Sequence, residues 1–444
     1  MSFSPAERIK SLRAKYPAAG FLAEKSWRLA PSPFTLDKKL AEELSSLGRV
    51  LLQFNRAVNL LYRQSVAGKM PGWVAEWLDL GKEPELIELQ RSNAFKNDLP
   101  RVIRPDILLT EDGFTIVELD SVPGAIGFTA WCNENYSAFG DKVIGGAEDM
   151  LRGFAGIFGS APKVRIIVSS ESSGYLPEME WLAARLGADR FSVHNAAFEG
   201  VADGEAVYRF FELFDLKNVA VARSLFSRAA EKKITLTPPP KPIFEEKMLF
   251  ALLWNRHLKD FWRKELGEGF FRVLQKHVPY SWLVDPAPLP AHAVLPELGI
   301  GSWQELKDFS QRERELILKI SGYSENAWGS RGVYLGSDLS HGEWAEAVDL
   351  AIESFNRSPF VLQRYQKPKL YESLWVDERN EMHPMQGRVR LCPYYFVSGE
   401  NEKMQANLSG VLATICPPDK KIIHGMQDAI LTSCMTVEEP EKAS

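Results

Sequence analysis

The chain has 444 residues, which is enough for about three domains of ordinary size, or two with large elaborations. Hydrophobic residues make up 45% of it and charged residues 25%, which is typical of a folded globular protein and excludes a disordered or collagen-like chain. The formal net charge of −5 leaves no overall basic field for non-specific binding of nucleic acid or anionic lipid.

The N-terminal part of the chain has the pattern of helices. Between residues 36 and 65, apolar side chains recur every three or four positions, which is the spacing of one helix face. We expect roughly the first 100 residues to be mostly helical. The pattern changes at Arg101, after which short apolar runs at 107–109 and 115–119 flank Glu111-Asp112-Gly113 and predict a β-hairpin.

The rest of the chain alternates strands and helices. A β-branched run at 164–168, a helical pattern ending near Leu186 and a second strand at 191–193 predict a βαβ unit. The clearest linker is 237–240, Thr-Pro-Pro-Pro, because successive prolines fit neither helix nor sheet. Further expected elements are helices at 244–254, 257–266 and 343–355, a loop at 285–292, and strands at 316–320, 333–335 and 360–363.

The hairpin permits a prediction of which residues face one another. With a three-residue loop at 111–113, closed by Gly113 in a left-handed conformation, Thr110 pairs with Phe114. The numbers of paired residues then sum to 224 along both strands. This register puts Asp106 opposite Glu118.

The same register puts Arg104 opposite Asp120, and all four side chains project from one face because strand side chains alternate. Crowded carboxylates repel one another unless cations lie among them, and hard oxygen ligands suit Mg²⁺ with bound phosphate. The alternative is a solvated polar face of an antiparallel sheet. A two-residue turn at Asp112-Gly113 would break the arrangement, by moving Asp106 to the face opposite Glu118.

Two lysines are candidates for phosphate binding. Lys319 lies near the end of the strand at 316–320 and precedes a loop with glycines at 322, 329 and 332, which offers a point charge and free backbone N–H groups. Lys247 lies at the start of a helix. The alternative for both is an ordinary solvated lysine. The strand that begins at Phe360 ends in polar residues, and its edge would suit either an adenine or water.

Taken together and in this order, these segments resemble the circularly permuted ATP-grasp family, whose members include the synthetase domain of glutathionylspermidine synthase. The resemblance covers roughly residues 101–434. In that family an Arg-x-Asp, followed some residues later by Glu-x-Asn, supplies a catalytic arginine and Mg²⁺ ligands. Arg104-Pro105-Asp106 and Glu118-Leu119-Asp120 match this pattern. The resemblance thus implies that Arg104 faces the transferring phosphate and that Asp106, Glu118 and Asp120 hold the metal.

The resemblance also implies a nucleotide site and a second arginine. Arg390, in Arg388-Val389-Arg390, matches a later strand whose arginine approaches the phosphate or the acyl group. The residues implied to bind ATP are Lys247, Lys319, Arg331, Gly332, Gln363 and Arg364. The sequence departs from the family pattern at Asp120, where Asn is usual, at Ile320, where proline usually follows the lysine, and in the bulky loop 321–331.

The resemblance implies a mixed α/β chain with a circularly permuted ATP-grasp fold. Its expected parts are a helical N-terminal region (1–100), a permuted metal-ligand segment of the ATP-grasp domain (101–160), a Rossmann-like pre-ATP-grasp βαβ unit (161–236), a first ATP-grasp subdomain (241–310), a second subdomain (311–436) and a tail (437–444).

The implied activity is that of an ATP- and Mg²⁺-dependent ligase that activates a carboxylate as an acyl phosphate and joins it to an amine. The alternatives are a nucleotide-binding pseudoenzyme or scaffold, and an ATP-grasp kinase that does not ligate. Small-molecule carboxylates and amines are the expected partners, with no nucleic acid and no membrane. Four widely spaced cysteines, no CxxC pair and no apolar N-terminal run favour reduced thiols in the cytoplasm.

Overall fold

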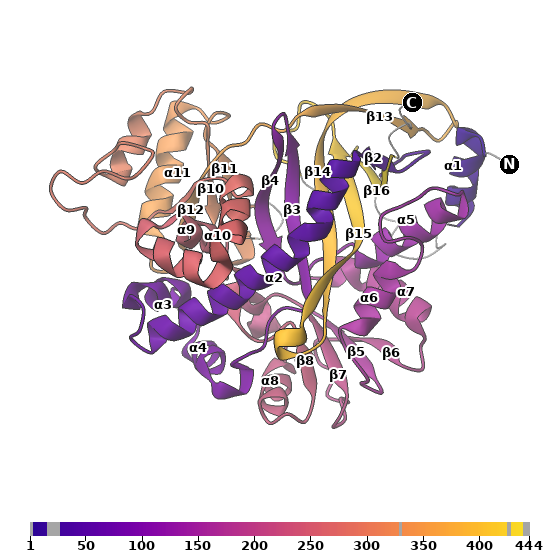
Figure 1. Ribbon diagram of the computed structural model, residues 1–444, viewed down its shortest axis with the longest axis horizontal. Coiled ribbons are helices and arrows are strands. Elements are labelled where there is room, and N and C mark those ends of the chain that lie inside the picture. The colour runs from indigo at the N-terminus through magenta and orange to yellow at the C-terminus, as the bar shows by residue number, and fades with distance from the viewer. Residues whose placement is uncertain (1–2, 16–26, 328–330, 424–427, 438–444) are drawn as a thin grey trace. The chain divides into compact units, whose positions relative to one another are not determined.

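The computed structural model describes residues 3–15, 27–327, 331–423 and 428–437 (Figure 1). The described chain is mixed α/β, with one eight-stranded and two four-stranded sheets. Its contacts divide it into two compact units. Unit 1 comprises Met1–Leu52, Asn97–Pro239 and Pro368–Ser444, and unit 2 comprises Gln53–Lys96 and Pro240–Lys367.

Unit 1 contains the eight-stranded sheet, in which early and late parts of the chain lie side by side (Figure 1). Its strand order is β13-β1-β16-β15-β14-β3-β4, and β2 pairs with β16. The long strand β14 pairs antiparallel with β15 along one edge and with β3 along the other. The strands are β1 Arg28–Leu29, β2 Phe34–Leu36, β3 Val102–Thr110, β4 Gly113–Asp120, β13 Leu370–Val376, β14 Met382–Ser398, β15 Gln405–Cys416 and β16 Ile430–Thr436.

Unit 1 also contains a parallel sheet in the order β6-β5-β7-β8. The predicted βαβ unit is confirmed, because β5 and β6 are parallel and α7 lies between them in the chain. The strands are β5 Val164–Val168, β6 Phe191–Asn195, β7 Ala206–Phe210 and β8 Thr235–Thr237. The helices of this unit are α1 Pro5–Ala14, α5 Ile126–Ala138, α6 Asp149–Gly156, α7 Leu176–Leu186 and α8 Ala222–Ala230.

One hydrophobic core joins the parallel sheet of unit 1 to helices and to β14. It includes Val164 and Ile166 from β5, Phe154 from α6 and Tyr394 from β14, all with no exposed surface. The ring of Phe154 meets those of Tyr208 and Phe396 edge to face. Burial of such large side chains stabilises the layer arrangement by about 25 cal/mol per Å² of apolar surface removed from water.

The predicted hairpin is present as β3 and β4, but its turn differs from the prediction. Thr110 pairs with Gly113, so the turn has two residues, Glu111 and Asp112, and the predicted three-residue loop is wrong. Gly113 has a φ of 124°, a conformation that favours glycine. By itself, the shorter turn would shift the pairing by one residue and would turn every side chain of β4 to the other face.

A β-bulge restores the predicted pairing at the other end of the hairpin. Ile107 pairs with Ile116, whereas Asp106 pairs with Glu118, so Val117 is the extra residue of the bulge. Beyond the bulge Arg104 lies opposite Asp120, as predicted. Bulges of this kind are frequent beside functional sites because they redirect side chains.

Unit 2 contains an antiparallel sheet in the order β11-β10-β12-β9. The strands are β9 Ser281–Leu283, β10 Leu316–Ile320, β11 Val333–Leu335 and β12 Phe360–Arg364. The helices are α3 Gly72–Asp79, α4 Pro84–Arg91, α9 Met248–Trp254, α10 Lys259–His277 and α11 His341–Glu353. The fully buried Trp344 of α11 packs in the core of this sheet and donates its indole N–H to the carbonyl of Leu306.

Most elements predicted from periodicity are confirmed. The long N-terminal helix is α2, Lys38–Val66, in which one unit ends at Leu52 and the other begins at Gln53. α10 is longer than predicted, because the chain continues as helix beyond a non-helical Gly267 with a φ of 71°. In the described part of the chain, no helix is both long and apolar enough to cross a bilayer.

Candidate functional site

Five predicted residues meet on one face of the large sheet of unit 1, which we call the carboxylate–arginine cluster: Arg104 and Asp106 of β3, Glu118 and Asp120 of β4, and Arg390 of β14. The two oxygens of Asp106 bind different arginines. Arg104 Nε lies 3.1 Å from Asp106 Oδ1, and Arg390 Nη1 lies 3.0 Å from Asp106 Oδ2. Arg104 also reaches Asp120 Oδ2 at 2.8 Å. Asp106 is therefore the shared counterion of two guanidinium groups.

Both carboxylate oxygens of Asp120, the residue at which the sequence differs from the pattern that it resembles, have partners in the structure. The second oxygen of this carboxylate, Oδ1, accepts a hydrogen bond of 2.8 Å from the backbone N–H of Val122, which follows the end of β4. The negative charge that Asp120 adds, relative to an asparagine, is thus paired with the guanidinium of Arg104 at 2.8 Å.

Burial and charge both act on the ionisable groups of the cluster. The side chain of Asp106 is 7% exposed, and that of Arg390 is 14% exposed. Burial, together with the nearby carboxylate of Glu118, raises the pKa of Asp120, although Arg104 opposes this effect. Burial lowers the pKa of Arg104, but the carboxylates of Asp106 and Asp120 outweigh it and raise that pKa well above its usual value.

Two residues of the site that the sequence analysis missed follow Arg390 along β14. Cys392 lies 3.5 Å through Sγ from Asp106 Oδ1, and Tyr394 donates from Oη to the carbonyl of Gly124 at 2.8 Å. Residues 390, 392 and 394 share one face because strand side chains alternate. The signal that could have found them is this i, i+2 spacing after Arg390.

The donor set of the cluster suits a hard divalent cation. Three carboxylates with oxygen donors lie on the paired strands β3 and β4, and such ligands favour Mg²⁺ over softer metals. The guanidinium groups of Arg104 and Arg390 lie among the carboxylates, where phosphate oxygens would also find partners. The residues present therefore fit a magnesium ion together with a phosphorylated ligand.

A second group of predicted residues lies in unit 2. Lys319 of β10 donates from Nζ to Gln363 Oε1 of β12 at 2.9 Å, and both side chains are buried. Gln363 in turn donates from Nε2 to Ser281 Oγ at 3.1 Å, which fixes the orientation of its amide. Lys247, directly before α9, donates from Nζ to the carbonyl of Ala327 at 3.1 Å. The structure thus brings Lys319 and Gln363 together.

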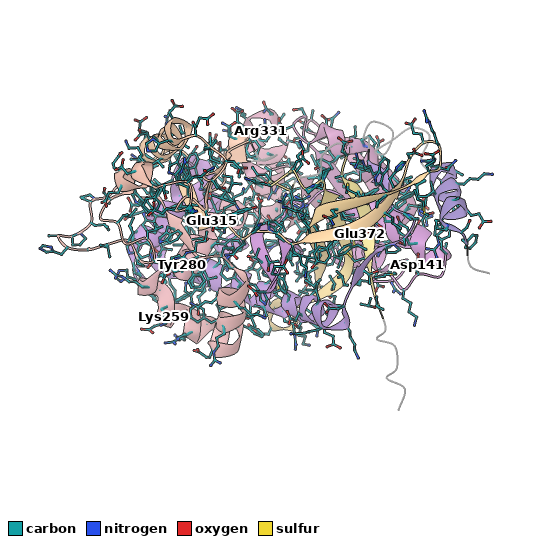
Figure 2. All side chains as sticks on the ribbon, turned by 90° about the horizontal axis from the view of Figure 1, so that it is seen from above. Asp141, Lys259, Tyr280, Glu315, Arg331 and Glu372 are labelled. Atoms are coloured by element: carbon teal, nitrogen blue, oxygen red, sulfur yellow. The ribbon has the colours of Figure 1, made fainter. Side chains whose placement is uncertain are left out.

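The remaining nucleotide candidates have different surroundings. Because strand side chains alternate, Arg364 points away from its neighbour Gln363, and its exposed guanidinium pairs with Glu297 at 3.0 Å. Arg331 is exposed (Figure 2), and part of the bulky predicted loop, residues 328–330, lies outside the described residues. A Cβ at Gly332 would lie 2.6 Å from the carbonyl of Asn326, so this position requires glycine.

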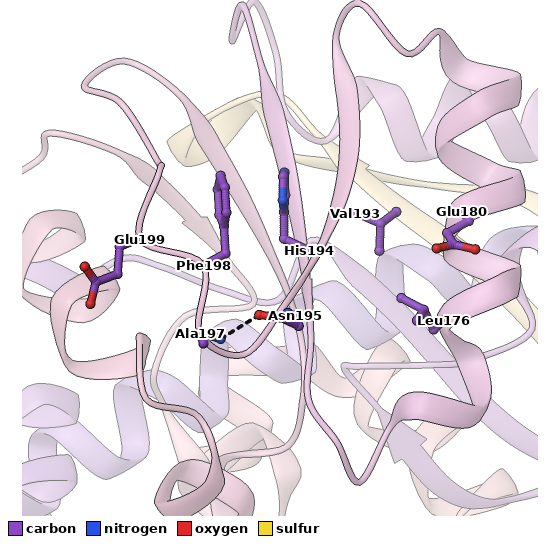
Figure 3. A pocket seen from close by; sticks show the side chains of 8 residues that line it. All are labelled: Leu176, Glu180, Val193, His194, Asn195, Ala197, Phe198 and Glu199. Atoms are coloured by element: carbon purple, nitrogen blue, oxygen red, sulfur yellow. Dashed lines mark hydrogen bonds between the residues drawn. The ribbon is translucent and has the colours of Figure 1, made fainter.

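A pocket of about 590 Å³ lies between α7, β6 and the loop after β6 (Figure 3). Its aromatic wall consists of His194 and Phe198, which stack with ring centroids 3.5 Å apart. His194 Nε2 lies 2.8 Å from Ser192 Oγ. Burial, followed by the charge of Arg165, lowers the pKa of His194, which favours the neutral form of its ring. No residue singled out in the sequence lines this pocket.

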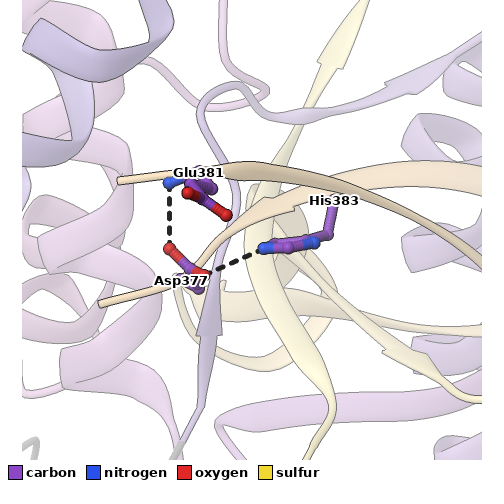
Figure 4. A group of neighbouring side chains, drawn as sticks. All are labelled: Asp377, Glu381 and His383. Atoms are coloured by element: carbon purple, nitrogen blue, oxygen red, sulfur yellow. Dashed lines mark hydrogen bonds and ion pairs between the residues drawn. The ribbon is translucent and has the colours of Figure 1, made fainter. Parts of the chain in front are cut away.

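A second polar group, Asp377, Glu381 and His383, lies at the turn between β13 and β14 (Figure 4). Asp377 Oδ1 accepts backbone N–H groups of Arg379 and Glu381, each at 2.9 Å, and Oδ2 lies 3.0 Å from His383 Nε2. These hydrogen bonds lower the pKa of Asp377. The contacts are those of a carboxylate that closes a turn.

The cysteines allow a direct chemical check of this structure. All four are buried and lie outside any disulfide of the described residues. Burial, followed by the nearby carboxylate of Asp106, raises the pKa of Cys392 to about 12. The thiol form of Cys392 is then strongly favoured at pH 8, and the thiolate is the reactive form.

We therefore expect iodoacetamide at pH 8 to leave the native protein unlabelled and to label all four cysteines in denaturant, as read by mass spectrometry. Rapid labelling of Cys392 in the native protein would contradict the packing of the cluster.

Comparison with known proteins finds solved structures that resemble this one. No family model matches the sequence, and no curated protein does either. A solved structure, that of a glutathione synthetase-like effector from Globodera pallida in its apo form, matches with a TM-score of 0.57 and 12% identity over 98% of this chain and 96% of that chain. The two proteins share a fold. A putative gamma-glutamylcysteine synthetase from Methylobacillus flagellatus KT matches at a TM-score of 0.41 and 12% identity, over 82% of this chain and 87% of the other.

The shared fold tests one expectation from the sequence, namely the fold class. A mixed α/β chain with several sheets is confirmed, and its likeness to the glutathione synthetase-like protein agrees with an ATP-grasp-like fold.

Proposed function

We propose that this protein is an ATP-dependent ligase that activates a carboxylate as an acyl phosphate and joins it to an amine. The observation that carries the proposal is the carboxylate–arginine cluster, in which Arg104 and Arg390 are both held by Asp106 on one sheet face. The likeness in fold to a glutathione synthetase-like protein supports it. So do the residues that match the circularly permuted ATP-grasp pattern, and we propose the permutation, the Rossmann-like unit and the domain order on that ground.

In this proposal the carboxylates hold the metal and the arginines bind the reacting anions. Asp106, Glu118 and Asp120 would hold Mg²⁺, which when bound neutralises phosphate oxygens. Arg104, oriented by Asp106 and Asp120, would stabilise the charge on the transferring phosphoryl group. Its fixed direction matters because electrostatic stabilisation is strongest when the donors need no rearrangement.

Arg390 is the proposed partner of the acyl substrate. Its Nε is buried and has no hydrogen-bond partner among the described residues, although its Nη1 binds Asp106. Directly across the β14–β15 ladder, Thr414 also has a buried hydroxyl without a partner in the described chain. Buried polar groups without partners cost about 1–3 kcal/mol each, and a carboxylate or phosphate oxygen would satisfy them.

In unit 2, we propose that Lys247 and Lys319 bind phosphates, and that Gln363 lies beside the adenine. Lys319 is held by Gln363 in a site from which bulk water is largely excluded, where a point charge on a phosphate is worth more than in solution. Gly332 would give the backbone close access to the nucleotide. Arg331 and Arg364 are the outer members of the proposed site, because both are exposed.

The reaction would proceed in two displacements. A carboxylate oxygen of the acyl substrate attacks the γ-phosphorus of ATP, and ADP leaves. The nitrogen of the amine then attacks the acyl carbon, inorganic phosphate leaves, and the amine gives up one proton. The arginines bind the anion that forms in the first displacement and the phosphate that leaves in the second.

A trapping experiment tests this function without knowledge of the natural amine. The protein is incubated with Mg·ATP, hydroxylamine and a panel of amino acids and dicarboxylates, and the hydroxamate and ADP are quantified. We expect hydroxamate and ADP in equal amounts for at least one carboxylate, and neither product without a carboxylate. A phosphorylated product that resists hydroxylamine would show a kinase, and tight binding of Mg·ATP without ADP formation would show a pseudoenzyme. Either result would contradict the ligase.

A further inference from the structure

A buried chain of polar groups in unit 2 links three separate segments of sequence. Lys82, in the connection between α3 and α4, places Nζ 2.5 Å from Glu246 Oε1, and both side chains are almost without exposed surface, at 0% and 1%. The other oxygen, Oε2, accepts a short hydrogen bond from Ser321 Oγ. Each oxygen of the buried carboxylate therefore has its own partner.

The last member of the chain, Ser321, is tied to the segment that carries Lys247. Its hydroxyl accepts the N–H of Met248 at 2.9 Å, and its carbonyl accepts the N–H of Lys247 at 2.8 Å. Ser321 also donates its own N–H to the carbonyl of Pro359 at 2.9 Å, and it has no exposed surface. It lies two residues after Lys319. This row of buried polar groups thus ends at Ser321, which is bonded to the backbone of Lys247 and lies close to Lys319 in sequence.

Close backbone contacts hold the segments at both ends of this row of polar residues, beside Lys82 and beside Ser321. At Gly81, next to Lys82, φ is +72° and a Cβ would lie 2.0 Å from the carbonyl of Arg357. At Gly322, next to Ser321, a Cβ would lie 2.3 Å from the carbonyl of Glu245. Any side chain at either position would force the backbone apart. Neither segment can shift without breaking these contacts.

The cost of burying charges indicates that these three polar residues contribute more to the position of the segments they join than to the stability of the fold. Removing an ion pair from water costs several kcal/mol per ion, so replacing such a pair with apolar residues of similar volume is often neutral or stabilising. What Lys82 and Glu246 supply is direction, because a carboxylate with one oxygen on an ammonium group and the other on a hydroxyl has a single orientation.

We propose that Lys82, Glu246 and Ser321 are positioning residues that hold Lys247 and the end of β10, with Lys319, in the geometry that binds nucleotide phosphates. This inference rests on the proposed function of the two lysines and extends it to Lys82, a residue far from both in sequence. The group that transmits the effect is Ser321, whose backbone and side chain together bind the start of α9.

The test compares Ser321→Ala with the wild type. The probe is the non-hydrolysable ATP analogue AMP-PNP with Mg²⁺, and binding is measured by titration calorimetry. The alanine variant loses the hydroxyl and leaves the Lys82–Glu246 pair in place, so we expect it to fold and to bind the analogue about tenfold more weakly. Ser321→Thr, which keeps the hydroxyl, should bind more like the wild type than like the alanine variant.

A double variant tests Lys82 without leaving a charge unpaired. Lys82→Met/Glu246→Gln removes both buried charges, and we expect weaker AMP-PNP binding together with faster amide hydrogen exchange at residues 321–327. The matched control is Lys307→Met, which breaks the partly exposed Lys307–Asp349 pair of the same unit and should change neither quantity. Thermal unfolding of each variant separates loss of positioning from loss of fold.

The outcomes separate the inference from the proposed function. If the wild type binds AMP-PNP, Lys319→Ala weakens it, and Ser321→Ala and the double variant bind as the wild type does, then the positioning role is wrong and the proposed function stands. If the wild type does not bind AMP-PNP, the proposed function fails, and the positioning role fails with it.

Discussion

Replacement of Glu118 by glutamine should lower the rate of ADP formation about a thousandfold at saturating Mg·ATP. Glutamine has nearly the shape of glutamate but no charge, so the cluster would lose one of the three carboxylates proposed to bind the metal while β4 keeps its pairing with β3. Glu118 is partly exposed, so we expect an unchanged midpoint of thermal unfolding. The measurement is steady-state ADP release across a range of Mg²⁺ concentrations.

The same hairpin supplies the control. Glu111, at the turn, is an exposed glutamate whose carboxylate pairs with Lys369 at 3.2 Å. Glu111→Gln should therefore behave as the wild type, since an exposed ion pair contributes little. Wild-type activity in Glu118→Gln would remove the metal assignment from the cluster.

Replacement of Lys319 by alanine should weaken Mg·ATP binding about a hundredfold. Lys319 is only 8% exposed, and its ammonium group donates a hydrogen bond to Gln363. A charge–charge contact between this group and a phosphate would therefore be poorly screened by water. Two such contacts, or one contact with two phosphate oxygens, account for about 2.7 kcal/mol. Titration calorimetry gives the dissociation constant directly.

Lys307→Ala is the appropriate comparison for this prediction. It removes another ammonium group of unit 2, whose partner Asp349 is 43% exposed, and should leave the dissociation constant for Mg·ATP unchanged. If Lys319→Ala also binds Mg·ATP with wild-type affinity, Lys319 has no contact with the nucleotide and the placement of the phosphates in unit 2 is wrong.

The hairpin shows how far local pattern could predict the site. The alternation of Arg104 and Asp106, and of Glu118 and Asp120, identified the shared face correctly, although the turn was assigned one residue too many. Periodicity reports which side chains alternate, but it does not report where a ladder skips a residue. The bulge at Val117 cancels the error in the turn, so the pairing at the site is as predicted.

The rest of the site depends on contacts between distant parts of the chain. The family resemblance implied a strand around Arg390, but the pairing of β14 with β3, which carries Arg390 to Asp106, has no local signature. The buried pair of Lys82 and Glu246 is a similar case, because each residue alone has the pattern of a solvated side chain in a turn or at a helix start. Such pairs follow from tertiary packing.

The strand order of the large sheet also determines when the site can form during synthesis. Once the ribosome has reached Lys367, every residue of unit 2 has been made. Unit 1 at that stage still lacks β14, so β3 has an unpaired edge and Asp106 lacks its second arginine. Exposed strand edges are prone to pair with other chains, so nascent chains that end before residue 382 would be vulnerable to aggregation. The carboxylate–arginine cluster is therefore among the last parts of the protein to be completed.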